Sequence, residues 1–294
     1  MAEKVQNSLV QQKDEEVKTL SSFLAKPTVQ AKLLNSLGTQ HELQKFTSSI
    51  VSAISTNKDL QKCEYGSVVA SGLLANALNL SLSPQLGFAY IVPFENRKEG
   101  TFTATFVLGY KGYIQLAIRS GYYKKINVLE IKEGELIRFD PMNEEIEVKL
   151  IEDFEEREKA KTIGYYAMFE HINGFRKAIY WSKEKMISHA DKYSPAFSRN
   201  AVTTGRVQKV SFADYEAGNF PKEDAWKYSS FWYRDFDEMA KKTMCRQLIS
   251  HWGIMSIDMQ KAYDADSNDM AQYENNEVGN DSPIDDFFGA GSQE

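Results

Sequence analysis

The chain has 294 residues, of which 42% are hydrophobic and 26% charged, and its formal net charge is −6. This length allows one large core or two smaller ones, and the composition is typical of a soluble globular protein. No run approaches the roughly 18 apolar residues of a membrane span, and the polar N-terminus does not resemble a secretory signal. Two cysteines are too few for a disulfide framework, so an intracellular protein with reduced thiols is expected.

Charge is segregated along the chain. Residues 264–294 hold nine acids and no Lys or Arg, so removing those nine charges from −6 leaves +3 for the rest. Residues 133–159 hold eleven acids and four bases, whereas 161–209 hold nine bases and three acids. Local fields therefore matter more than the total, and the negative net charge does not exclude a polyanionic partner.

The first part of the chain is predicted to be helical. Residues 1–16 are polar and predicted to be disordered, while apolar residues recur at helical spacing over 17–80. The small apolar segment 67–80 predicts a well-buried helix. Strand patterns begin at Gly87, where two apolar stretches flank the charged loop 95–100 and predict a hairpin.

Further strands and helices follow. Strands are predicted over 123–131 and 144–150, and the alternating Glu residues of the second indicate the solvated face of an edge strand. Asn173-Gly174 predicts another hairpin, because this dipeptide tolerates the positive φ angles of a tight turn. Helical patterns return over 182–190 and 231–252. The end of the chain is too acidic and too poor in apolar periodicity to fold alone.

Motifs of covalent chemistry are missing from the sequence. It contains neither a GxxxxGK[ST] phosphate loop nor a GxSxG nucleophile elbow. Its four histidines stand alone, without HExxH spacing, and a lone histidine is more often structural than catalytic. We therefore predict no catalytic residue and no metal ligand.

Three basic clusters remain as candidate sites, and each has two interpretations. All of them would suit a polyanion. The first is otherwise an ordinary solvated helix face, the second a mobile loop, and the third a core helix with an internal Glu–Lys pair worth ~0.2–0.5 kcal/mol. The clusters are Lys111, Gln115 and Arg119; Arg199, Arg206 and Lys209; and Glu238, Lys242 and Arg246.

A resemblance goes further than charge and spacing. Three blocks of the sequence are similar to the RecT family of phage single-strand annealing proteins: GFAYIVPF, FVLGYKGYIQLAIRSG and FDEMAKKTMCRQL. The resemblance covers about residues 20–255 in order. Both ends of the chain and the acidic stretch 133–159 match poorly.

The resemblance implies a fold and an activity. The fold would be α+β, with N-terminal helices followed by an antiparallel sheet backed by helices, and a basic groove, assembling into rings or helical filaments. A single annealing and oligomerisation domain would cover 17–258, before an acidic, disordered tail at 259–294. The activity would be ATP-independent annealing of complementary strands in homologous recombination, without a covalent step. No cofactor is expected, and Mg²⁺ would at most assist annealing without a protein site.

The resemblance also implies partners and site residues. The partners would be single-stranded DNA, the nascent duplex, further copies of the chain, an exonuclease and the host single-strand-binding protein. The location would be the cytoplasm of a bacterial host cell, away from membranes. Tyr110, Ile114 and Ile118 would anchor one helix to the sheet. Phosphates would be held by Lys111, Gln115, Arg119, Arg199, Arg206, Lys209, Lys242 and Arg246.

Other interpretations stay open at this point. A metal-dependent enzyme acting on nucleic acid would need clustered acids in the groove, and an interaction scaffold would use the basic clusters to bind an acidic protein. In the tail, SPIDDFF at 282–288 resembles the tip of bacterial single-strand-binding proteins, but six residues follow Phe288 where that tip is terminal. The tail either docks a partner or only keeps the protein soluble.

Overall fold

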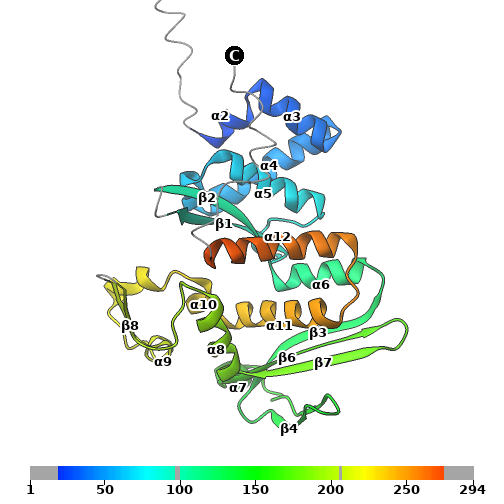
Figure 1. Cartoon of the computed structure of the whole chain (residues 1–294), viewed down its shortest axis with the longest axis vertical. Helices are drawn as coiled ribbons and strands as arrows, with labels where there is room; N and C mark the ends of the chain where they lie inside the picture. The colour runs from blue at the N-terminus through cyan, green and yellow to red at the C-terminus, as the bar shows by residue number, and fades with distance from the viewer. Residues whose placement is uncertain (1–18, 97–99, 205–206, 275–294) are drawn as a thin grey trace, which may run out of the picture. The chain divides into compact units, whose positions relative to one another are not determined.

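The computed structural model describes residues 19–96, 100–204 and 207–274 (Figure 1). The chain divides into two compact units: the described residues up to Val107 belong to the first, and those from Leu108 onward belong to the second. The range 17–258 therefore contains two structural units, and their action as one functional domain stays a prediction. No described helix is long and apolar enough to cross a membrane.

The first unit contains the N-terminal helices and a hairpin, as the sequence predicts. Gly72 shows how closely its helices pack, because a Cβ added there would lie 2.1 Å from the δ-carbon of Ile50. The two strands pair with each other in a two-stranded sheet. The elements are α2 (Leu20–Leu24), α3 (Pro27–Leu37), α4 (Gln40–Thr56), the 3-10 helix η1 (Lys58–Lys62), α5 (Tyr65–Ala77), β1 (Ala89–Asn96) and β2 (Thr101–Leu108).

The second unit holds the three-stranded sheet β3-β6-β7, with β6 in the centre. Both strand pairs are antiparallel, and the β6–β7 turn contains Gly174 at φ 87°, as the Asn-Gly signal predicts. The strands are β3 (Tyr123–Lys132), β4 (Leu136–Asp140), β5 (Glu145–Val148), β6 (Thr162–His171), β7 (Arg176–Ser182), β8 (Val202–Thr204) and β9 (Val207–Lys209). The helices are α6 (Tyr110–Arg119), α7 (Phe154–Lys159), α8 (Lys183–Tyr193), α9 (Phe212–Glu216), η2 (Lys222–Tyr228), α10 (Phe231–Arg234), α11 (Phe236–Trp252) and α12 (Ile257–Glu274).

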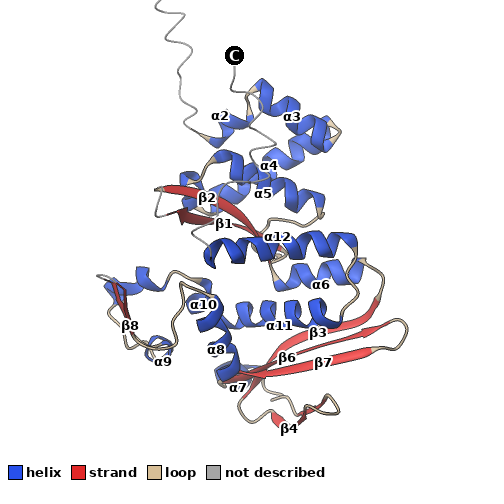
Figure 2. Ribbon diagram, viewed as in Figure 1, coloured by secondary structure: helices blue, strands red, loops and turns tan. Residues whose placement is uncertain are grey.

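Helices and sheet form successive layers in this unit (Figure 2). Helices α8 and α11 pack on the sheet, α6 packs on α11, and α12 packs on α6. The Tyr165 hydroxyl of β6 donates to the Asp237 carboxylate of α11 at 2.6 Å, which ties the sheet to the helix above it. On the other face of the sheet, Tyr180 of β7 lies 5.1 Å from Phe139 of β4, measured between ring centroids. The predicted combination of helices with antiparallel sheet is thus confirmed, and the structure has several antiparallel sheets where one was expected.

The last described helix differs from the predicted tail. We expected disorder over 259–294, but α12 runs to Glu274, and Met259 and Ala262 are buried. Asp266, at 2% exposure, lies on the same buried side of the helix. The buried side thus consists of two apolar residues and one acid, and the acidic composition of the segment kept sequence analysis from recognising it. The rest of that tail, with the segment 282–288, lies outside the described residues, as do residues 1–16.

Candidate nucleic-acid interface

The helix α6 is anchored by a different set of residues from the one expected. Its buried residues are Gly112, Tyr113, Leu116 and Ala117. Ile118, which we expected to anchor the helix, is 57% exposed, so this prediction is wrong. The reason is that α6 contacts α11 and α12 rather than the sheet face alone, and this turns another side of the helix inward.

The polar stripe of α6 remains accessible. Lys111 is exposed, and within the described parts of the chain no carboxylate lies within ion-pair distance of its Nζ. Arg119 is also exposed and lies 4.0 Å from the Asp258 carboxylate, at the limit of an ion pair. Gln115, between them, is half-buried. An exposed pair of this kind contributes only about 0–1 kcal/mol.

The second cluster is engaged with the protein itself. Arg199 forms an ion pair with Glu184 of α8 and donates to the Ser188 hydroxyl at 3.2 Å. Lys209 donates from Nζ to the Ala196 carbonyl at 2.8 Å. These contacts fasten the segment after α8, and phosphate contacts by Arg199 and Lys209 stay a prediction. Arg206 lies outside the described residues.

The third cluster is built around a buried carboxylate. Lys242 is 9% exposed, and its Nζ lies 2.6 Å from the Asp266 carboxylate. Arg246 lies 3.0 Å from the same carboxylate. The alternative interpretation of this cluster included an internal Glu–Lys pair, and Glu238 forms such a pair with Lys241, at 2.6 Å, rather than with Lys242. Phosphate contacts by Lys242 and Arg246 therefore stay a prediction that competes with a strong internal partner.

Two further donors complete the surroundings of Asp266. The Tyr113 hydroxyl donates to its carboxylate at 3.1 Å, and the Leu108 backbone N–H donates at 3.3 Å. Burial first, and then the Asp266 charge, raise the pKa of Tyr113, so that its hydroxyl keeps its proton. Sequence analysis missed Asp266 and Tyr113, because they are 153 positions apart and no local pattern joins them.

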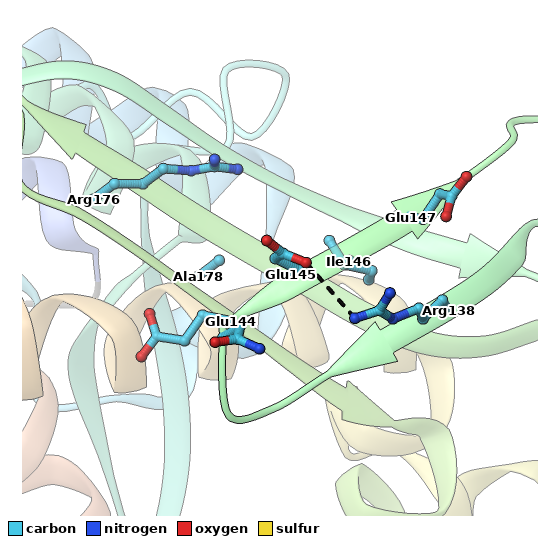
Figure 3. Close-up of a pocket in the computed structure, with 8 residues that line it drawn as sticks. Arg138, Glu144, Glu145, Ile146, Glu147, Arg176 and Ala178 are labelled. Carbon is cyan, nitrogen blue, oxygen red and sulfur yellow. Dashed lines mark ion pairs between the residues drawn. The ribbon is translucent and has the colours of Figure 1, made fainter.

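A polar hollow elsewhere in the second unit does not suit a polyanion. It has a volume of about 490 Å³ and lies between the β4–β5 pair and β7 (Figure 3). Arg138 pairs there with Glu145 at 3.7 Å, and Glu144 pairs with Lys177. Its carboxylates outnumber its guanidinium groups, so phosphates would be repelled. The hollow is lined by Arg138, Asn143, Glu144, Glu145, Ile146, Glu147, Arg176 and Ala178.

The acidic residues do not assemble into a metal site in the described ranges, where no group of three or more His, Cys, Asp or Glu side chains could hold an ion. Glu145 and Glu147 of β5 are exposed and alternate with half-buried residues, as expected for an edge strand. The local structure thus follows the alternation in the sequence.

Comparisons with known proteins show which family and which relatives this chain is similar to. The model of the RecT family matches residues 44–280. The "Uncharacterized protein YqaK" of Bacillus subtilis (strain 168) is 39% identical over 244 residues, which cover 83% of this chain and 70% of that protein. "Protein RecT" of Escherichia coli (strain K12) is 25% identical over 247 residues, which cover 83% of this chain and 79% of that protein.

The chain belongs to the RecT family. Membership supports a protein of DNA recombination that acts in single-strand annealing. The family predicted from the three sequence blocks is therefore confirmed.

Proposed function

We propose that this protein binds single-stranded DNA through its phosphates and anneals complementary strands without ATP and without making or breaking a covalent bond. The observation that carries the proposal is the α6 stripe, in which Lys111 and Arg119 are exposed on a helix anchored from its other side. They are eight positions apart, which is about 12 Å along the helix axis. The two cations can therefore face different phosphates of one strand.

Phosphate binding suits annealing for a physical reason. Contacts to phosphates fix the position of a strand but carry no sequence information. They leave the base edges free to pair with a second strand. A protein that holds DNA in this way needs no catalytic residue, which fits the family's role in annealing.

Assembly would multiply these weak contacts. We propose that copies of the chain form rings or helical filaments in which a basic groove repeats along the DNA. Linked sites gain affinity through effective concentration rather than through new contacts. Arg199, Arg206, Lys209, Lys242 and Arg246 are proposed as further groove cations, and Mg²⁺ as an aid that has no site of its own.

The proposed setting is the cytoplasm of a bacterial host. There an exonuclease would generate the single strand, and the host single-strand-binding protein would be displaced from it. The segment 282–288 is the proposed docking element for that binding protein. Deleting residues 264–294 would also remove Asp266, so the matched deletion begins after Glu274 and is expected to keep annealing of naked strands.

The decisive experiment combines annealing with salt titration. Wild-type protein should anneal two complementary oligonucleotides without ATP, with a steep salt dependence of binding. Each single-strand phosphate contact adds about −0.7 to the slope of log K against log salt. Lys111→Ala/Arg119→Ala should therefore weaken binding to every sequence alike and make the slope shallower by roughly 1.4.

A matched control removes the same charge elsewhere. Lys149 and Lys159 are exposed residues in the acidic stretch around β5 and α7, and Lys149→Ala/Lys159→Ala should leave the slope nearly unchanged. Circular dichroism verifies folding of both variants. If the folded α6 variant keeps wild-type affinity and slope, the stripe is an ordinary solvated face and the proposed interface is wrong.

A further inference from the structure

Three aromatic rings come together where β7 meets α8. The Trp181 and His189 ring centroids are 5.4 Å apart, and those of His189 and Tyr193 are 4.6 Å apart. His189 and Tyr193 are one helical turn apart on α8. Trp181 lies opposite Tyr165 in the β6–β7 register, and therefore on the sheet face that α8 and α11 cover.

Two lysines flank these rings. The Lys185 Nζ lies 4.2 Å from the centre of the Trp181 ring, and the Lys192 Nζ lies 5.1 Å from the centre of the Tyr193 ring. Both lysines are exposed, and over the described ranges neither has a carboxylate within ion-pair distance. Cations held over aromatic faces gain about 0.5–1 kcal/mol at exposed sites. The lysines keep enough freedom to bind an anion.

The acids of α8 are already engaged. Glu184 pairs with Arg199, and the Asp191 carboxylate accepts a hydrogen bond from the Arg199 backbone N–H at 2.8 Å. The pKa of His189 is lowered to about 4, first by burial and then by the charges of Arg246, Lys185 and Lys192. Positive charge thus predominates around a neutral imidazole.

Core packing does not account for all three rings. Two residues of α8, Met186 and Ala190, are fully buried, both at 0% exposure. Tyr193 is 40% exposed, and Trp181 and His189 are half-buried. The rings therefore lie at the edge of the packed side, where part of their surface meets solvent.

We propose that Trp181, His189 and Tyr193 form a stacking platform for the bases of single-stranded DNA, with Lys185 and Lys192 holding the adjoining phosphates. The inference rests on the proposed function and adds a second kind of contact to it. Stacking uses the face of a base and leaves its pairing edge free, so it is compatible with annealing. Aromatic platforms beside basic residues bind single strands with little sequence preference, because every base has a π face.

The test compares a normal strand with one that lacks bases. Binding of oligothymidylate and of an abasic strand of equal length is titrated for wild type and for Trp181→Ala/Tyr193→Ala. Wild type should prefer oligothymidylate. The variant should bind it at least about 5-fold more weakly, with an unchanged salt slope, and should bind the abasic strand as wild type does.

Two further variants show whether a change in DNA binding comes from lost stacking, from lost charge or from a folding defect. Trp226 is 64% exposed and belongs to η2 rather than to β7 or α8, so Trp226→Ala should behave as wild type on both strands. Lys185→Ala/Lys192→Ala changes two exposed side chains without touching the core. It should make the salt slope shallower by roughly 1.4 on both strands.

The outcomes distinguish the two proposals. If wild-type protein fails to bind oligothymidylate, the proposed function is wrong. If wild type binds but the ring variant keeps wild-type affinity, the platform is wrong while phosphate binding stands. Should the ring variant unfold, Trp181→Phe decides: quenching of wild-type fluorescence by oligothymidylate should shrink in this variant, and undiminished quenching would overturn the platform.

Discussion

Two helices of this protein carry cations at four-residue steps and use them in opposite ways. On α6, Lys111 and Arg119 are exposed, whereas on α11, Lys242 and Arg246 enclose a carboxylate that is 2% exposed. Spacing along a helix determines which side chains share a face. The layer in which the helix lies determines whether that face meets water.

The difference follows from what surrounds each helix. Helix α11 lies between the sheet and α6, so both of its broad sides are covered. Its polar residues must then find partners inside the protein, because an unpaired buried charge is costly. Helix α12 supplies Asp266 as that partner. Helix α6 keeps one side open, and Lys111 and Arg119 on that side are exposed.

The largest expected effect comes from removing the buried carboxylate. Asp266→Ala leaves Lys242 and Arg246 without their shared anion and should lower the free energy of unfolding by about 3–5 kcal/mol. Urea denaturation measures this loss. Asp264 is exposed on the same helix, and Asp264→Ala should change stability by no more than about 0.5 kcal/mol. Equal, small effects of both substitutions would mean that the buried cluster contributes little.

Double-mutant cycles should show a difference in coupling free energy between the two regions, and this difference is expected to be smaller than the loss of stability in Asp266→Ala. Lys242→Met combined with Asp266→Asn should show a coupling of about 0.5–3 kcal/mol, since the two side chains are in direct contact. Arg119→Ala combined with Asp258→Ala should show a coupling of about 0–1 kcal/mol, because that pair is exposed and 4.0 Å apart. Denaturant titration of the single and double variants gives both values. Similar couplings would erase the contrast between the two helices.

The neutral residue Gln115 tests whether the salt slope reports charged contacts of the α6 stripe. Gln115→Ala removes a hydrogen-bonding group but no charge from the α6 stripe. It should weaken binding of single-stranded DNA by about 0.5–1.5 kcal/mol, while the salt slope stays that of wild type. The measurement is the same salt titration, with Lys111→Ala as the comparison. A changed slope in Gln115→Ala would show that the slope does not report phosphate contacts alone.

The remaining prediction concerns the pKa of His189, which the charge of Arg246 helps to lower. The pKa of His189 is lowered from 6.5 to about 4, chiefly by burial and then by Arg246. Between these values the unfolded chain binds the proton more readily, so stability falls as the pH is lowered from 6.5 towards 4. His189→Gln should make this fall shallower in acid titrations followed by circular dichroism. An NMR titration that placed the His189 pKa near 6.5 would contradict the expectation.

Much of the fold could be predicted from local patterns. The Asn173-Gly174 turn, the hairpin around 95–100 and the N-terminal helices depend on interactions among neighbouring residues, which the sequence displays directly. Lys111 is exposed, and its contact with DNA stays a prediction. The three sequence blocks were sufficient to indicate the RecT family, because each contains many specific residues at fixed positions.

The tertiary structure decided the rest, for reasons that no local pattern contains. Asp266 belongs to an acidic segment that we expected to be disordered, and its order depends on Lys242, Arg246 and Tyr113, which lie far from it in sequence. Ile118 is exposed because α6 meets two other helices. By itself the sequence determined the N-terminal helices, the hairpins and the family, since these follow from short-range geometry and shared motifs. Which cations face water and which are neutralised inside was decided by packing, because burial is a property of layers that come together only in the folded protein.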